Sequence, residues 1–206
     1  MSRTRLVLAA LALIVLAALA GFAVRQGLFG GDRPATGAVA VGGPFQLVDQ
    51  NGRPTDEKVL RGKWSALFFG FTYCPEACPT TLLALRQAET LLGPSAKDLQ
   101  TVFISVDPAR DTPSQLRSFL ANDAFPKHVV GLTGTPEQVD KTARAYHVFY
   151  AKDGQGSDYL VNHSTMTYLM NPTGRFVCVI PYGLTPEQMA ERIRKAMRAG
   201  RDAEAC

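Results

Sequence analysis

Apolar positions along the chain form short continuous runs that alternate with longer stretches of helical spacing. The apolar runs, typical of buried strands, are residues 65–72, 101–106 and 128–133. The helix-spaced stretches that follow them are residues 80–92, 114–122 and 136–146. Strands alternating with helices predict a core of parallel strands covered by helices.

Further strand signals flank this alternation. Residues 44–50 and the Asn51-Gly52 dipeptide predict an N-terminal strand that enters a hairpin. Late in the chain, four strand-like runs precede a last helix opened by Thr185 and Pro186. Those runs are residues 147–152, 159–164, 165–170 and 175–180, the last two predicted to form an antiparallel hairpin. The expected class is α/β: a thioredoxin-like fold with an extra N-terminal β-hairpin.

The N-terminus is predicted to be a membrane anchor. Arg3 and Arg5 precede residues 6–24, which carry no charge and would span about 28 Å as a helix. A cleaved signal peptide is the competing interpretation, because residues 18–20 offer a small-x-small cleavage site. The apolar run continues to residue 24, which favours one retained transmembrane helix.

This assignment sets the expected organisation and location. The divisions are an anchor at 1–25, a linker at 26–43, a thioredoxin-like domain at 44–200 and a tail at 201–206. With the basic end inside, the domain is expected on the exported, periplasmic side of the inner membrane. That compartment tolerates disulfides.

Charge and cysteine content narrow the functional classes. The net charge is only +4, and no basic stripe is interleaved with aromatic residues, so nucleic-acid binding has no support. Four cysteines are too few for a disulfide-built scaffold when 46% of residues are hydrophobic. The short spacing of one cysteine pair therefore points to cysteine chemistry.

That pair is Cys74 and Cys78, each followed by a proline. A residue before proline avoids the helical region, whereas proline is tolerated at the first helical position. The helix is therefore predicted to begin at Pro79, with Cys78 at or near its N-cap. Both sulfurs would lie at the positive end of the helix dipole, which favours thiolates.

Two uses of these thiolates remain open at this point: a redox couple and a metal site. The three residues between the cysteines, 75–77, exceed the two of thioredoxin-type couples, and they present two sulfurs to one ion without strain. Copper accepts thiolate and imidazole ligands in both of its oxidation states. Structural zinc would need four ligands, and the sequence offers no second pair at the right spacing.

A histidine is the expected third ligand. His128 lies in a loop, where a solvated side chain is the simpler interpretation, and His147 lies at a helix-to-strand junction, where capping or packing is simpler. His163 precedes the late hairpin, at a junction expected beside the cysteine-bearing helix. We favour His163 as the ligand.

Four segments together resemble the Sco (SenC) family of copper-binding cytochrome c oxidase assembly proteins. They read GPFQLVDQNGRP, GKWSALFFGFTYCPEACP, ISVDPARDTP and VNHSTMTYLMNPTGRF, and the resemblance covers roughly residues 43–199. It implies a membrane-tethered domain with copper ligands Cys74, Cys78 and His163. It also implies delivery of copper to the binuclear copper centre of a haem-copper oxidase, a copper-accepting oxidase subunit and a copper donor as partners, and reduction of the target subunit's cysteines.

Some positions are not ligands in the implied site. Tyr73 stands where the family often has histidine, and Glu76 where aspartate is frequent. Asp107 and Asp111 lie in the family's acidic loop, where capping the next helix and turn is at least as good an interpretation as tuning the copper site. The remaining cysteines are expected to be a buried, inert thiol at Cys178 and a free tail thiol at Cys206.

The alternatives are separated by which residues they need. A thiol–disulfide oxidoreductase uses Cys74 and Cys78 as a catalytic redox pair but does not need His163. A thiol peroxidase would need a dedicated set of groups around one cysteine, which the sequence does not show, and a redox sensor would be recognised only by its partner. The expectation is a metallochaperone first, with thiol–disulfide reductase activity as the alternative.

Overall fold

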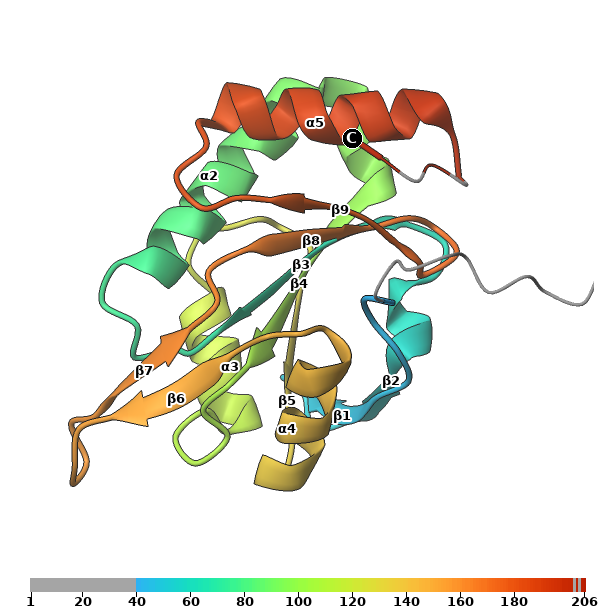
Figure 1. Cartoon of the computed structure of the whole chain (residues 1–206). Coiled ribbons are helices and arrows are strands. Elements are labelled where there is room, and N and C mark those ends of the chain that lie inside the picture. Colours follow the sequence, from blue (N-terminus) through green and yellow to red (C-terminus); the bar gives the residue numbers. More distant parts are fainter. Residues whose placement is uncertain (1–39, 202, 204) are drawn as a thin grey trace, which may run out of the picture. The chain divides into compact units, whose positions relative to one another are not determined.

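The computed structural model of the chain describes residues 40–201, 203, 205 and 206. Seven strands form one mixed sheet in the order β2-β1-β5-β4-β3-β8-β9 (Figure 1). They are β1 (Gln46–Asp49), β2 (Pro54–Asp56), β3 (Trp64–Gly70), β4 (Leu99–Ser105), β5 (Val129–Thr133), β8 (Thr167–Met170) and β9 (Phe176–Ile180). The helices are α2 (Ala77–Leu92), α3 (Pro113–Leu120), α4 (Pro136–Ala145) and α5 (Pro186–Ala199), with short 3-10 helices η1 (Glu57–Leu60) and η2 (Gly93–Asp98).

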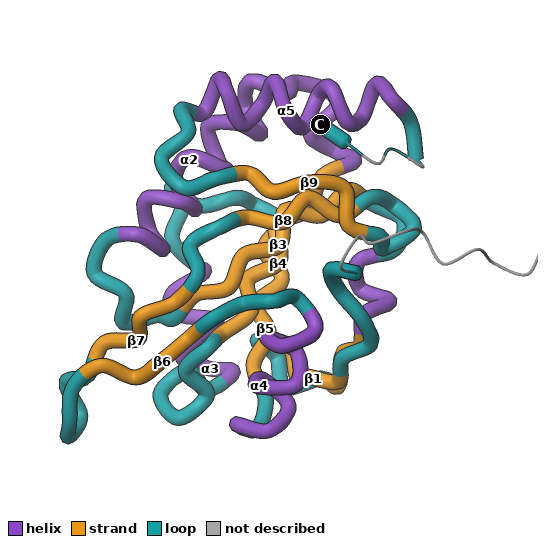
Figure 2. The backbone as a smooth tube through the Cα atoms, in the orientation of Figure 1, coloured by secondary structure: helices purple, strands orange, loops and turns teal. Residues whose placement is uncertain are grey.

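Strand directions follow the predicted plan. The central strands β3, β4 and β5 run parallel, β1 and β2 form the antiparallel N-terminal hairpin, and β8 and β9 close the other edge antiparallel. The thioredoxin-like architecture and the extra hairpin are therefore confirmed. The tube drawing shows the same alternation of strands and helices (Figure 2).

Strand β3 is the central support of the fold, and all seven of its residues are buried. Successive side chains of a strand point to opposite faces. Gly70 accordingly approaches Cys78 of α2, whereas Phe69 packs on Tyr146 beyond α4. On the α2 side, α2 and α5 share an apolar cluster with the sheet and lie together above it in Figure 1. Cys78, in the first turn of α2, packs instead in the other apolar cluster, next to the end of β3.

Helix starts follow proline and capping chemistry, with one correction. Thr135 and Thr185 each form a capping box, and the prolines after them take the first helical positions as predicted. Helix α2, however, begins at Ala77, so the predicted start at Pro79 is wrong. Proline is tolerated there as well, because the first four N–H groups of a helix lack partners within it.

Strands β6 (Tyr150–Asp153) and β7 (Leu160–His163) form a hairpin of their own, separate from the seven-stranded sheet. In Figure 1 this hairpin projects from the lower edge of the molecule. Its last residue is His163, which pairs with Tyr150 across the hairpin. Among the described residues, no backbone ladder joins this hairpin to the main sheet.

The expectations for the last two cysteines are wrong. Cys178 of β9 and Cys206 at the end of the chain form a disulfide that spans 28 residues of sequence. Ala203 is buried in the same apolar cluster that holds α5, so the tail packs on the core. The apolar neighbours of residue 178 in the sequence gave no hint of a partner so distant along the chain.

The membrane anchor predicted for residues 1–25 and most of the linker predicted for residues 26–43 lie outside the described residues. Within the described part, no helix is long and apolar enough to cross a membrane. Residues 41–206 form one compact unit.

Candidate metal centre

Cys74 and Cys78 come from the junction of β3 and α2. Cys74 lies in the loop, where its N–H donates to the carbonyl oxygen of Phe71 at 3.2 Å. Cys78 lies in the first turn of α2, and its N–H donates to the sulfur of Cys74 at 3.3 Å. An N–H group that has no partner within the helix therefore donates to the sulfur of Cys74. Such a hydrogen bond stabilises the thiolate form of that cysteine.

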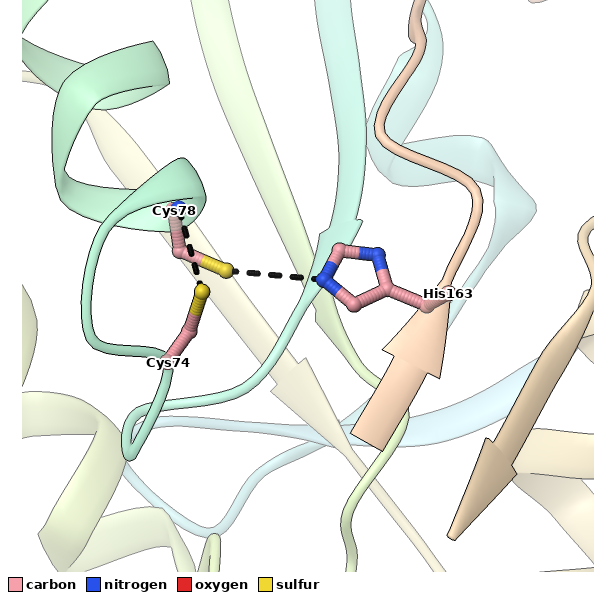
Figure 3. A group of neighbouring side chains, drawn as sticks. All are labelled: Cys74, Cys78 and His163. Carbon is pink, nitrogen blue, oxygen red and sulfur yellow. Dashed lines mark hydrogen bonds between the residues drawn. The ribbon is translucent and has the colours of Figure 1, made fainter. Parts of the chain in front are cut away.

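His163 reaches this pair from the end of β7. Its Nε2 lies 3.8 Å from Sγ of Cys78, and its Nδ1 lies 2.9 Å from the carbonyl oxygen of Ser164 (Figure 3). A carbonyl only accepts hydrogen bonds, so Nδ1 carries a proton and donates it. In the neutral ring, Nε2 then directs a lone pair at the sulfurs, which is the arrangement that metal-binding histidines adopt.

The three side chains converge on one point. One atom from each of Cys74, Cys78 and His163 lies within 4.8 Å of the others. Both cysteines are free thiols, not joined to each other. Figure 3 shows the two sulfurs and the imidazole facing a common space between the loop, the helix and the hairpin. No other group of three potential ligands occurs in the described part of the chain.

The two sulfurs differ in acidity. The pKa of Cys74 is lowered to about 4, mainly because its sulfur accepts a hydrogen bond from the Cys78 thiol, with backbone N–H groups assisting and burial opposing. The pKa of Cys78 is raised, first by that same hydrogen bond, then by burial and by the charge of Cys74. The pair therefore holds one thiolate and one thiol when no metal is bound.

The protein encloses most of the centre. Cys78 is fully buried, Cys74 is only 9% exposed and His163 is half-buried. The rings of Phe68 and Phe71 pack edge-on against the imidazole, with centroids 6.3 and 5.8 Å away. Access from solvent is therefore on the side of Cys74 and His163.

The other two histidines lie elsewhere, as expected. His128 is exposed in the loop before β5, and His147 is exposed after α4. His147 has a φ of 54°, which fits a residue that ends a helix. Neither belongs to the group of converging ligands.

The capping roles expected for Asp107 and Asp111 are wrong. Thr112 caps α3, because its side chain accepts from the N–H of Gln115. The Asp111 carboxylate instead accepts from Thr72, and the Asp107 carboxylate accepts from Tyr159. Thr72 lies two residues before Cys74, and Tyr159 precedes β7, so both acids contact segments that supply the centre.

Sequence reasoning missed two contributors. Gly70 leaves the space that the sulfur of Cys78 occupies, since an added Cβ would lie 2.8 Å from that atom. Tyr159 carried no signal beyond its position four residues before His163. A glycine that ends a buried strand next to a functional loop was the one available hint.

Comparisons with known proteins identify the family of this chain. The family model SCO1/SenC matches residues 33–198. Protein SCO1 homolog 1, mitochondrial, of Arabidopsis thaliana is 45% identical over 146 residues, which is 70% of this chain and 43% of that protein. The chain thus matches less than half of that relative's length. Protein SenC of Rhodobacter capsulatus is 39% identical over 168 residues, covering 80% of this chain and 75% of the relative.

A solved structure shares the fold in detail. The crystal structure of Arabidopsis thaliana ScoI with copper bound superposes with a TM-score of 0.73 at 40% identity, covering 78% of this chain and 99% of that one. The family match covers most of the sequence, and the fold agrees with it. The chain belongs to the SCO1/SenC family.

Proposed function

We propose that this chain is a copper chaperone that binds one copper ion through Cys74, Cys78 and His163. The observation that carries the proposal is the convergence of two sulfurs and one imidazole nitrogen within 4.8 Å. Soft thiolates with one imidazole suit copper in both oxidation states, and three ligands are too few for a closed zinc site. The copper-bound structure of the Arabidopsis relative supports the choice of metal.

The site is built for holding and releasing copper. Binding needs both sulfurs as thiolates, so loading releases the Cys78 proton, whose pKa is raised by the hydrogen bond to Cys74, by burial and by the Cys74 charge. A positively charged ion offsets the last of these causes. Cys74 and His163 lie toward solvent, whereas Cys78 is fully buried. An acceptor with its own thiolates would therefore displace Cys74 and His163 first and take the ion from Cys78 last.

The recipient we propose is the binuclear copper centre of a haem-copper oxidase, in its copper-accepting subunit. The basis is membership of the SCO1/SenC family, because the resemblance of the chain to that family implies this role in oxidase assembly. We further propose that residues 6–24 anchor the chain in the inner membrane and place the domain in the periplasm. The Cys178–Cys206 disulfide supports export, because such bonds persist in oxidising compartments.

A second activity, thiol–disulfide reduction, is favoured by the unequal sulfurs. The Cys74 thiolate would attack a target disulfide, form a mixed disulfide and release one target thiolate. Cys78 would then give up its proton, attack the Cys74 sulfur and release the second target thiolate. The chain ends with a Cys74–Cys78 disulfide, so an external thiol reductant must restore it before another turn.

The discriminating experiment measures copper content and disulfide reduction in the same reduced full-length protein. His163→Ala should lower copper affinity by more than about 100-fold, beyond the loss usual for groups outside the ligand set. His128→Ala is the matched control, since its side chain is exposed and distant from the cysteines in the site group. Cys74→Ser with Cys78→Ser should abolish both activities.

Two results would overturn parts of the proposal. Unchanged copper affinity in His163→Ala would remove histidine from the ligand set. A wild-type chain that reduces disulfides rapidly yet binds no copper would make the oxidoreductase the primary function. Copper transfer is checked by mixing the loaded chain with a reduced acceptor subunit and following copper by size separation.

A further inference from the structure

The loop between β4 and α3, residues 107–112, contacts both segments that supply the metal centre. On the cysteine side, Asp111 accepts hydrogen bonds from the N–H of Thr72 at 3.1 Å and from its hydroxyl at 2.6 Å. Ser105 donates to the same carboxylate at 2.6 Å. Asp111 is fully buried, so these bonds tie the start of the cysteine loop to the core.

On the histidine side, the same loop holds the β6–β7 hairpin. The hydroxyl of Tyr159 donates to Asp107 at 2.6 Å, and Nη1 of Arg110 donates to the carbonyl oxygen of Ser157 at 3.1 Å. Ser157 and Tyr159 lie in the segment that leads into β7. Because no backbone ladder among the described residues joins this hairpin to the main sheet, these side-chain bonds help determine where His163 lies.

The guanidinium of Arg110 connects the two sides. Its Nε donates to Asp107 at 2.5 Å, and its central carbon lies 3.6 Å from the ring centroid of Tyr159 and 4.7 Å from that of Tyr73. Tyr73 directly precedes Cys74. Nη2 of Arg110 is buried without a hydrogen-bond partner in the described structure, and the surrounding rings, including Phe71, supply cation–π attraction instead.

We propose that Asp107, Arg110 and Tyr159 are positioning residues that fix the His163 hairpin against the cysteine loop and so set the third ligand of the copper site. The inference rests on the proposed copper-binding function. Asp107 does not belong to the group of converging ligands, and α3 does not use it as its cap. Asp107 and Tyr159 therefore act on copper through the hairpin that carries His163, and Arg110 joins that hairpin to the cysteine loop.

The test substitutes Tyr159→Phe, which removes only the hydroxyl that Asp107 accepts from and keeps the ring that Arg110 covers. Copper(I) affinity is measured against a competing chelator in the reduced full-length protein. The expected loss is about 10-fold to 100-fold, the range for groups that orient a metal ligand. Tyr182→Phe is the matched control, because that side chain is exposed in the loop before α5.

A double-mutant cycle separates positioning from general destabilisation. In a His163→Ala background, Tyr159→Phe should cause no further loss of copper affinity, because its effect acts through the missing imidazole. An equal loss in both backgrounds, or no loss in the wild-type background, would overturn the proposal. A structural defect alone would lower affinity regardless of residue 163.

A measurement without copper distinguishes failure of this inference from failure of the proposed function. In the metal-free reduced chain, Tyr159→Phe should shift or broaden the ring-nitrogen NMR signals of His163, whereas Tyr182→Phe should leave them unchanged. Unchanged His163 signals in Tyr159→Phe would refute the positioning role. If wild type binds no copper while these signals do change, the copper function fails and the positioning of His163 stands.

Discussion

The sulfurs of Cys74 and Cys78 differ in acidity although only three residues separate the two cysteines. Cys74 accepts hydrogen bonds from Cys78 and from helix N–H groups, which lowers its pKa to about 4, whereas Cys78 is buried behind it with a raised pKa. In the folded state Cys74 is a thiolate at neutral pH. It is therefore the first sulfur available to a metal, to an alkylating agent or to a target disulfide.

This asymmetry predicts the pH dependence of modification. In the metal-free reduced chain, iodoacetamide should label Cys74 at a rate that is nearly constant above about pH 5 and falls as the pH drops through about 4. In urea the rate should instead follow an ordinary thiol with a pKa of about 8.5. Peptide mapping by mass spectrometry assigns the label. Preferential labelling of Cys78, or a folded-state midpoint near 8.5, would contradict the assignment.

The same shift has a consequence for stability. A lowered folded-state pKa means that the thiolate contributes its full stabilisation above the unfolded pKa of about 8.5, and that this stabilisation is lost as the pH falls through about 4. Replacing Cys74 with Ser should therefore make the free energy of unfolding depend less on pH between about 4 and about 8.5.

At this scale, the sequence indicated the side chains that can reach a metal but not those that hold them in place. Cys74, Cys78 and His163 stand out because few residue types bind copper and the chain has few of them. The roles of Asp107 and Tyr159 depend on a contact between segments 52 residues apart. No local pattern encodes such a contact, and a capping role for the acid was equally consistent with the loop.

At the scale of the elements, the close approach of β3 to α2 determines where the sulfur of Cys78 lies. Gly70 ends β3, and a Cβ there would lie 2.8 Å from the sulfur of Cys78 and 2.9 Å from a ring carbon of Phe103. Neither neighbour has room to retreat, because both are fully buried. The absence of a side chain at residue 70 therefore allows the strand and the helix to meet.

Gly70→Ala should lower the free energy of unfolding by about 1–3 kcal/mol, the usual cost of overpacking, and should weaken copper binding by displacing a ligand sulfur. Denaturant unfolding and copper competition measure the two effects. Gly43→Ala is the control, since its Cβ would lie at an ordinary 3.5 Å from the Cβ of Ala145. Equal behaviour of the two variants would show that the approach at Gly70 is not tight.

Element types were predictable because the pattern was strong: continuous apolar runs gave the central strands, and Thr-Pro pairs marked two helix starts. The start of α2 was not, because proline is compatible with several positions of a first turn. The separation of the β6–β7 hairpin from the main sheet depends on packing of the whole domain, which periodicity does not report.

For the whole molecule, the unpredicted feature is the link between the chain's end and its core. The Cys178–Cys206 disulfide closes 28 residues that include α5, the helix that packs beside α2 over one face of the sheet. Closing a loop of this length is worth about 3–4 kcal/mol in the chain-entropy account. The disulfide constrains α5, which packs beside α2, and its two cysteines are not part of the metal centre.

Cys206→Ser should therefore lower the melting temperature by several degrees, up to about 3–4 kcal/mol of unfolding free energy, and leave copper stoichiometry unchanged. Calorimetry with and without a thiol reductant tests this, because the difference from wild type should vanish once the wild-type disulfide is reduced. An identical melting temperature without reductant, or loss of copper in Cys206→Ser, would show that the tail plays another part.

X-ray absorption at the copper edge of the reduced, copper(I)-loaded full-length protein tests the ligand set most directly. The expected spectrum shows two sulfur neighbours and one imidazole nitrogen, with only the nitrogen lost in His163→Ala and none lost in His128→Ala. A wild-type spectrum with sulfur neighbours alone, or a nitrogen neighbour that persists in His163→Ala, would contradict copper binding by Cys74, Cys78 and His163.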